Sequence, residues 1–258
     1  MPDHRISIEP SPKRLRAMFN GKTIADSLCA ALMLEDGELP VYYFPRDDVR
    51  MDHLEPTSHR THCAFKGDAI YWTLKLGDRV AENAVWSYEN PLPAASRIAG
   101  WLAFQWDKVD NWFEEDEEVF GHPHDPHHLI DIRPSSRTVR VTLGTEQIAF
   151  TRKGLFLFET GLPTRYYFPP EDVRKDLFEP SALKTTCAYK GEASYWSLRA
   201  SGKLAENAVW SYLRPNPEYQ RIKGYYCFYP EKVDLIEVEG ERAIRGSAVN
   251  PAQQSWGD

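Results

Sequence analysis

The sequence predicts a mainly β protein that consists of two tandem copies of one domain. Two observations carry this prediction. The sequence matches itself without gaps at an offset of 124 residues. Short segments rich in Val, Ile, Tyr, Phe and Trp alternate with Gly, Asn, Asp and Pro, which is typical of strands joined by turns, whereas helical periodicity is scarce. A chain of 258 residues that is 42% hydrophobic can form two ordinary cores.

The repeat is visible in long strings. YYFPRDDVRMDHLEP at 42–56 corresponds to YYFPPEDVRKDLFEP at 166–180, and THCAFKGDAIYWTL at 61–74 corresponds to TTCAYKGEASYWSL at 185–198. AENAVWSY at 81–88 recurs unchanged at 205–212, and LMLEDG and FLFETG match upstream. We therefore predict a first β-rich repeat over 1–115, an acidic and His-rich linker over 116–132, a second repeat over 133–240, and a C-terminal tail over 241–258.

Strands of the first repeat are expected at 14–19, 22–26, 30–34, 61–66, 69–76, 79–88 and 98–105, with matching strands in the second. Residues 48–54 fit either a helical turn or an extended run, and residues 93–97 fit a short turn.

Composition excludes several classes of function. The net charge of -7, with basic residues scattered among acids, is unlike a nucleic-acid-binding surface. No apolar run is long enough to span a membrane, and the start MPDHRISIEP lacks a signal-peptide segment, so we expect a cytoplasmic protein. The four cysteines form no CxxC pair, so we expect reduced thiols and no zinc knuckle.

The strings CxxKGxAxYW and AENAxWSY resemble the hallmarks of the family named domain of unknown function 427, and the resemblance covers nearly the whole chain twice. It implies a β-rich fold related to the β-tent topology of methionine sulfoxide reductase B and the thalidomide-binding domain of cereblon. Many members of that wider group bind zinc through paired cysteines, which this chain lacks. The family also carries a label suggesting nucleotidyl transfer, but no P-loop or paired-Asp metal motif accompanies it here.

Aromatic and polar residues of the recurring strings are the candidate ligand-binding residues, because concave sites combine aromatic walls with a few convergent polar groups. We expect Trp72 and Trp86 to face one another or to flank one groove. In the alternative, the aromatic residues simply form the core, and Glu and Asn fix turns. The candidates are Tyr43, Tyr71, Trp72, Glu82, Asn83, Trp86, Tyr88 and Arg97, with Tyr167, Tyr195, Trp196, Glu206, Asn207, Trp210, Tyr212 and Arg221 in the second repeat.

Catalytic candidates are Cys63, Lys66, Glu82 and His62. An ammonium group near Cys63 would activate its thiol, but Lys66 reaches it only if a bulge or turn precedes Gly67. The alternative is a buried thiol and a structural lysine. Glu82 would act as a general base, or else lie exposed or pair with Arg97, with Asn83 at a bulge or turn.

Histidines favour the first repeat for acid–base chemistry. His53, His59 and His62 have no histidine counterparts in the second repeat. The linker string HPHDPHH contains metal-ligand residue types, but two prolines restrict it, and we predict neither a metal nor a cofactor.

Small-molecule binding is the leading hypothesis, with the two halves packed as an intramolecular pseudo-dimer. The alternatives are an enzyme of unknown reaction with its site in the first repeat, and a non-catalytic protein-interaction module.

Overall fold

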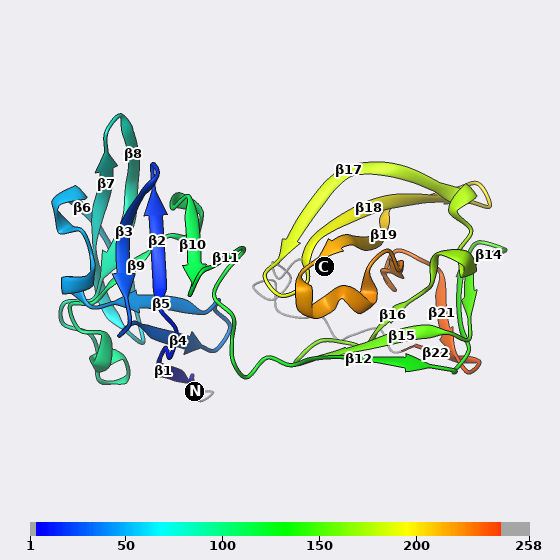
Figure 1. Ribbon diagram of the computed structural model, residues 1–258. Helices are drawn as coiled ribbons and strands as arrows, with labels where there is room; N and C mark the ends of the chain where they lie inside the picture. The colour runs from blue at the N-terminus through cyan, green and yellow to red at the C-terminus, as the bar shows by residue number, and fades with distance from the viewer. Residues whose placement is uncertain (1–3, 244–258) are drawn as a thin grey trace. The chain divides into compact units, whose positions relative to one another are not determined.

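The computed structural model describes residues 4–243, and the predicted mainly β fold is confirmed (Figure 1). The chain divides into two compact units, at residues 1–125 and 126–258. Within the described residues no helix is long and apolar enough to cross a bilayer.

The first unit contains two antiparallel sheets. A seven-stranded sheet has the order β1-β4-β5-β9-β8-β7-β6, and a four-stranded sheet has the order β11-β10-β2-β3. The strands are β1 (Ile6–Pro10), β2 (Leu15–Phe19), β3 (Lys22–Ser27), β4 (Ala31–Glu35), β5 (Val41–Phe44), β6 (Leu54–Cys63), β7 (Gly67–Leu76), β8 (Arg79–Ser87), β9 (Leu102–Phe104), β10 (Asn111–Glu114) and β11 (Glu117–Val119). Short 3-10 helices are η1 (Arg46–Asp48), η2 (Met51–His53), η3 (Pro93–Ile98) and η4 (Trp106–Lys108).

The second unit repeats this topology. Its sheets have the orders β12-β15-β16, β17-β18-β19-β20 and β14-β13-β21-β22, and the first two are joined by the bridge between Phe168 and Tyr226. The strands are β12 (Ile130–Ser135), β13 (Val139–Leu143), β14 (Glu146–Thr151), β15 (Gly154–Glu159), β16 (Arg165–Tyr167), β17 (Phe178–Cys187), β18 (Gly191–Ala200), β19 (Lys203–Pro215), β20 (Cys227–Phe228), β21 (Leu235–Val238) and β22 (Glu241–Arg242). The 3-10 helices are η5 (Pro170–Asp172), η6 (Lys175–Leu177) and η7 (Pro217–Ile222). In Figure 1, η7 is the orange coil of the second unit.

Each predicted strand of the first repeat overlaps an observed one, with two changes of extent. The strand expected at 61–66 runs over 54–63 instead, and residues 64–66 form the turn into β7. The segment expected at 98–105 is extended only at 102–104, because η3 continues to Ile98. Strands β1, β5, β10 and β11 were not predicted. The stretch 116–132 contains β11 and the start of β12, and the tail lies outside the described residues from 244 onward.

Each unit has two clusters of buried side chains, one on either face of its larger sheet. In the first unit the inner core lies between the two sheets and includes Phe19, Phe44, Leu74, Phe104 and Trp112. The second cluster, here called the aromatic face, lies on the other side of the seven-stranded sheet and includes residues of η3. In the second unit the equivalent aromatic face contains Tyr167, Tyr195, Trp210 and Tyr212. Burial of apolar side chains on both faces therefore stabilises the larger sheet.

Candidate functional site

A row of aromatic side chains crosses the aromatic face of the first unit. Tyr43 on β5 lies opposite Ala103 on β9, Ala103 lies opposite Trp86 on β8, and Trp86 lies opposite Tyr71 on β7. Side chains opposite one another on adjacent strands point to the same side of a sheet, so these rings share one surface. The indole Nε1 of Trp86 donates a hydrogen bond to the Tyr43 hydroxyl at 3.1 Å, which fixes the orientation of the indole.

The rim of this row combines polar and aromatic groups from β6. The ring of His59 lies 4.5 Å from that of Tyr71, and the hydroxyls of Thr61 and Tyr71 are 2.9 Å apart. Cys63 packs beside the same cluster. Tyr71, Trp86 and Cys63 are only half-buried, so part of the row is open to solvent.

A buried ionic triad adjoins the aromatic face in each unit. In the first unit the Lys66 ammonium and the His4 Nε2 both contact the carboxylate of Glu35, the histidine at 2.9 Å. In the second unit Lys190 Nζ lies 2.6 Å and His128 Nε2 lies 2.9 Å from Glu159. Lys190 is 1% exposed and Glu159 8% exposed, so each charge is stabilised by its partner rather than by water.

The lysine of each triad lies in a tight turn, between β6 and β7 in the first unit and between β17 and β18 in the second. The backbone of Gly67 has φ +94°, which favours glycine, and Gly191 has φ +97° at the equivalent turn. The carbonyl of Lys66 accepts a hydrogen bond from the Leu92 N–H at 3.0 Å, which ties the turn to the segment before η3. Lys66 therefore has structural contacts, as one alternative from the sequence proposed: its backbone joins the turn to Leu92, and its ammonium pairs with Glu35.

Burial sets the ionisation of the groups on this face. Burial raises the pKa of Tyr43 and of Tyr88 above their usual range, so both hydroxyls are protonated at neutral pH. Burial also raises the pKa of the Cys187 thiol, outweighing the opposing effect of the nearby Lys190. The Lys190 N–H lies 3.4 Å from Cys187 Sγ, so the turn does bring the two residues together, but it produces no reactive thiolate there.

The expectation that Trp72 and Trp86 face one another is wrong. Trp72 packs in the inner core, with the Arg46 guanidinium 5.5 Å from its ring, whereas Trp86 belongs to the aromatic face. Neighbouring strand positions point to opposite faces, and Trp72 follows Tyr71, which shares its face with Trp86. Trp196 likewise packs against the inner core of the second unit, apart from Trp210.

Glu82 and Asn83 lie at an irregularity in the pairing of β7 and β8 and do not belong to the aromatic row itself. Asn83 has φ +50° and Asn207 φ +49°, both beside irregularities in strand pairing, as one sequence alternative proposed. The Thr57 hydroxyl donates to Asn83 Oδ1 at 2.8 Å, and the side chain of Glu82 is exposed. Asn tolerates the left-handed conformation better than most residues, which explains why it stands at this bulge in both units.

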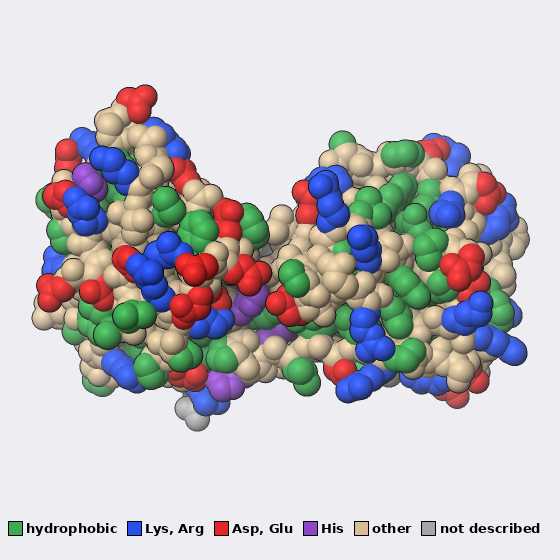
Figure 2. All heavy atoms as spheres, in the orientation of Figure 1, with side chains coloured by type: hydrophobic (Ala, Val, Ile, Leu, Met, Phe, Trp, Pro, Cys, Tyr) green, Lys and Arg blue, Asp and Glu red, His purple; other side chains and the backbone are tan. Residues whose placement is uncertain are grey.

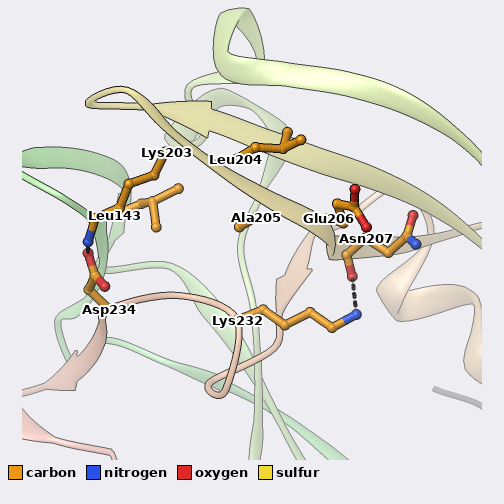
Figure 3. A pocket seen from close by; sticks show the side chains of 8 residues that line it. All are labelled: Leu143, Lys203, Leu204, Ala205, Glu206, Asn207, Lys232 and Asp234. Atoms are coloured by element: carbon orange, nitrogen blue, oxygen red, sulfur yellow. Dashed lines mark hydrogen bonds and ion pairs between the residues drawn. The ribbon is translucent and has the colours of Figure 1, made fainter.

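Open depressions lie beside both bulges. In the first unit one of about 540 Å³ includes Thr57, His59, Glu82 and Asn83 in its lining. In the second unit one of about 650 Å³ is lined by Leu143, Lys203, Leu204, Ala205, Glu206, Asn207, Lys232 and Asp234 (Figure 3). There Lys203 pairs with Asp234 at 2.7 Å, and Lys232 donates to the Asn207 carbonyl at 3.1 Å. Both lysines therefore already have partners within the depression.

The remaining predicted residues have structural contacts. Arg97 donates to the Ile8 carbonyl at 2.9 Å and Arg221 to the Ile132 carbonyl at 3.0 Å, so each ties a 3-10 helix to an edge strand. His62 is exposed and contacts Asp68 at 2.6 Å. Among residues 4–243 no group of three or more His, Cys, Asp or Glu side chains is arranged to hold a metal ion.

Sequence reasoning missed His4, Glu35, His128 and Glu159. A signal was present, because each histidine and each glutamate recurs at the same offset as the lysines they contact. Glu35 and Glu159 end the matched strings LMLE and FLFE, but a glutamate at the end of a strand reads as exposed unless its distant partner is known.

The chain is thus a tandem duplication of a two-sheet β domain that has an aromatic face and a buried lysine–glutamate–histidine triad in each copy. Comparison with family models places it in a known family. The model of the family described as a domain of unknown function (DUF427) matches residues 7–115 and 131–239, so the chain belongs to that family. No curated protein matches the chain at a significant level.

Proposed function

We propose that the protein binds a small molecule, and that the binding surface of the first unit is the half-buried row formed by Tyr71 and Trp86 with its rim of His59, Thr61 and Cys63. One observation carries the proposal. Aromatic rings and hydrogen-bonding side chains converge on a partly open surface next to a buried ionic triad, whereas the inner core on the other face of the sheet is closed and consists mainly of apolar side chains. Ligand sites in proteins combine apolar walls with a few well-placed polar groups in this manner.

The ligand best suited to this surface is planar and uncharged. Stacking on indole and phenol rings favours a flat π-system. Glu35 balances the charge of Lys66, so neither side chain offers an unpaired full charge to a charged ligand. On the side visible in Figure 2, basic and acidic side chains are interspersed over both units, which is unlike a surface for a polyanion.

Binding of a flat heteroaromatic probe tests the proposal. The full chain labelled with 5-fluorotryptophan is titrated with indole or quinoline, and the fluorine resonances are assigned by single Trp→Phe substitutions. We expect the Trp86 resonance to shift with a Kd in roughly the millimolar range, because ligands of about ten atoms seldom bind more tightly.

Trp86→Phe and Trp72→Phe are matched variants, because the two rings lie on opposite faces of one sheet. Trp86→Phe should weaken the binding of the probe, and Trp72→Phe should leave its Kd unchanged. A titration that moves no resonance of the aromatic face, or that moves Trp72 instead, would refute the proposal.

The packing of the two units as a pseudo-dimer, a β-tent topology and a cytoplasmic location all stay predictions. Small-angle X-ray scattering of the full chain addresses the first. A pseudo-dimer requires a radius of gyration close to about 18 Å, the value for one compact body of this length. A clearly larger radius would indicate two separate units.

A further inference from the structure

One of the differences between the two units beside the aromatic face is the side chain that follows β9 and β20. Gln105 follows β9 in the first unit, and Tyr229 stands at the equivalent position of the second unit. The backbone is the same at both places, since the Gln105 N–H donates to the Ala84 carbonyl at 2.8 Å and the Tyr229 N–H donates to the Ala208 carbonyl at 3.0 Å. The difference therefore lies in the side chain.

Tyr229 lies on the aromatic residues of its own unit. Its ring centroid is 4.4 Å from that of Trp210 and 6.5 Å from that of Tyr195, to which it is nearly parallel at 8°. Its hydroxyl oxygen is 3.5 Å from the Tyr195 hydroxyl. The Arg165 guanidinium lies 5.4 Å from the Trp210 ring, at a position that Val41 occupies in the first unit.

The two rows also differ in burial. Trp210 and Tyr195 are 0% and 2% exposed, whereas Trp86 and Tyr71, their counterparts in the first unit, are half-buried. A tyrosine side chain buries a large area when it stacks on other rings, and glutamine offers no ring for that purpose.

We infer that Tyr229 is a built-in occupant of the second aromatic face, and that the first unit accepts a free phenolic ring at the equivalent place. This inference rests on the proposed function and assigns the ligand class and the unit that binds it. The phenol of Tyr229 shows which ring the face accommodates. The Tyr195 hydroxyl, which contacts the Tyr229 hydroxyl, has a counterpart in the first unit. Tyr71 contacts Thr61 at 2.9 Å as Tyr195 contacts Thr185 at 2.8 Å.

The probe for the experiment is p-cresol, which reproduces the tyrosine side chain. The full chain labelled with 5-fluorotryptophan is titrated in the wild-type form and as Gln105→Tyr, Tyr229→Gln and Tyr229→Phe. Wild type should show one site, reported by Trp86, and Gln105→Tyr should weaken that site at least tenfold. Tyr229→Gln should add a second site, reported by Trp210, whereas Tyr229→Phe keeps the ring and should retain one site.

The outcomes separate this inference from the proposed function. If folded Tyr229→Gln gains no second site while wild type still binds, the built-in occupant is refuted and the proposed function survives. If indole shifts Trp86 and p-cresol does not, the phenolic class is refuted alone. If neither probe shifts the Trp86 resonance, both the inference and the proposed function are refuted. Should Tyr229→Gln fail to fold, an unchanged Kd in Gln105→Tyr would overturn the inference, and a tenfold loss would support it.

Discussion

Replacing Glu159 by Gln should destabilise the second unit strongly. The substitution keeps the shape of the side chain but leaves the ammonium of Lys190, which is 1% exposed, without its counter-charge. Removing one partner of a buried ion pair costs about 3–5 kcal/mol, a large share of the ~5–15 kcal/mol that stabilises a typical domain. For a unit of this size the loss corresponds to a fall in Tm of at least about 10 °C.

A double-mutant cycle measures this loss by urea unfolding of the full chain. Glu159→Gln and Lys190→Met should each destabilise the second unit, and the double variant should be less destabilised than their sum, because no buried charge is then left unpaired. Asp176→Asn breaks the exposed pair with Arg174 and serves as the control that should leave the unfolding midpoint unchanged. A loss below about 1 kcal/mol for Glu159→Gln, or strict additivity, would refute the view that the triad is a mutually dependent buried unit.

Three further predictions concern Glu159, Asn83 and the four cysteines. Burial acts to raise the pKa of Glu159, but hydrogen bonds and charge attraction from His128 and Lys190 outweigh it and lower the pKa overall. The stabilisation from Glu159 is therefore present above about pH 4.3 and is lost as pH falls through the folded pKa. Urea unfolding from pH 6 to 3 should show a shallower decline in stability for Glu159→Gln than for wild type, and equal slopes would contradict this. Asn83→Ala should lower stability by about 1–2 kcal/mol because of its positive φ, whereas Asn83→Gly should be better tolerated, and thermal unfolding of the two variants decides the order. Thiol labelling of the native chain should be fast at Cys29, intermediate at Cys63 and slow at Cys187 and Cys227, and rapid labelling of Cys187 would contradict its burial.

Much of the fold could be predicted from the sequence because the two repeats can be aligned with each other. Strings that recur at one offset fix the duplication, and turn residues such as Asn20–Gly21 mark the hairpins. Strand β6 was predicted only in part, because its residues 55–60 are largely exposed and polar and show no apolar alternation. The β1 segment ISIEP ends in proline and carries too few residues for a clear pattern.

The candidate site was only partly predictable, for reasons of pairing register. Tyr71, Trp86, Tyr43 and Tyr88 do meet on one face, but the placement of Trp72 on the other face follows from alternation along β7. The contact of Lys66 with Glu35 and His4 joins segments far apart in the chain, which no local pattern reports.

The most direct test is a crystal structure of the full chain soaked with p-cresol. We expect a phenolic ring on Trp86 and Tyr71 in the first unit, with Tyr229 packed against Trp210 in the second unit and no p-cresol there. A bare first aromatic face, with p-cresol bound only elsewhere, would contradict it.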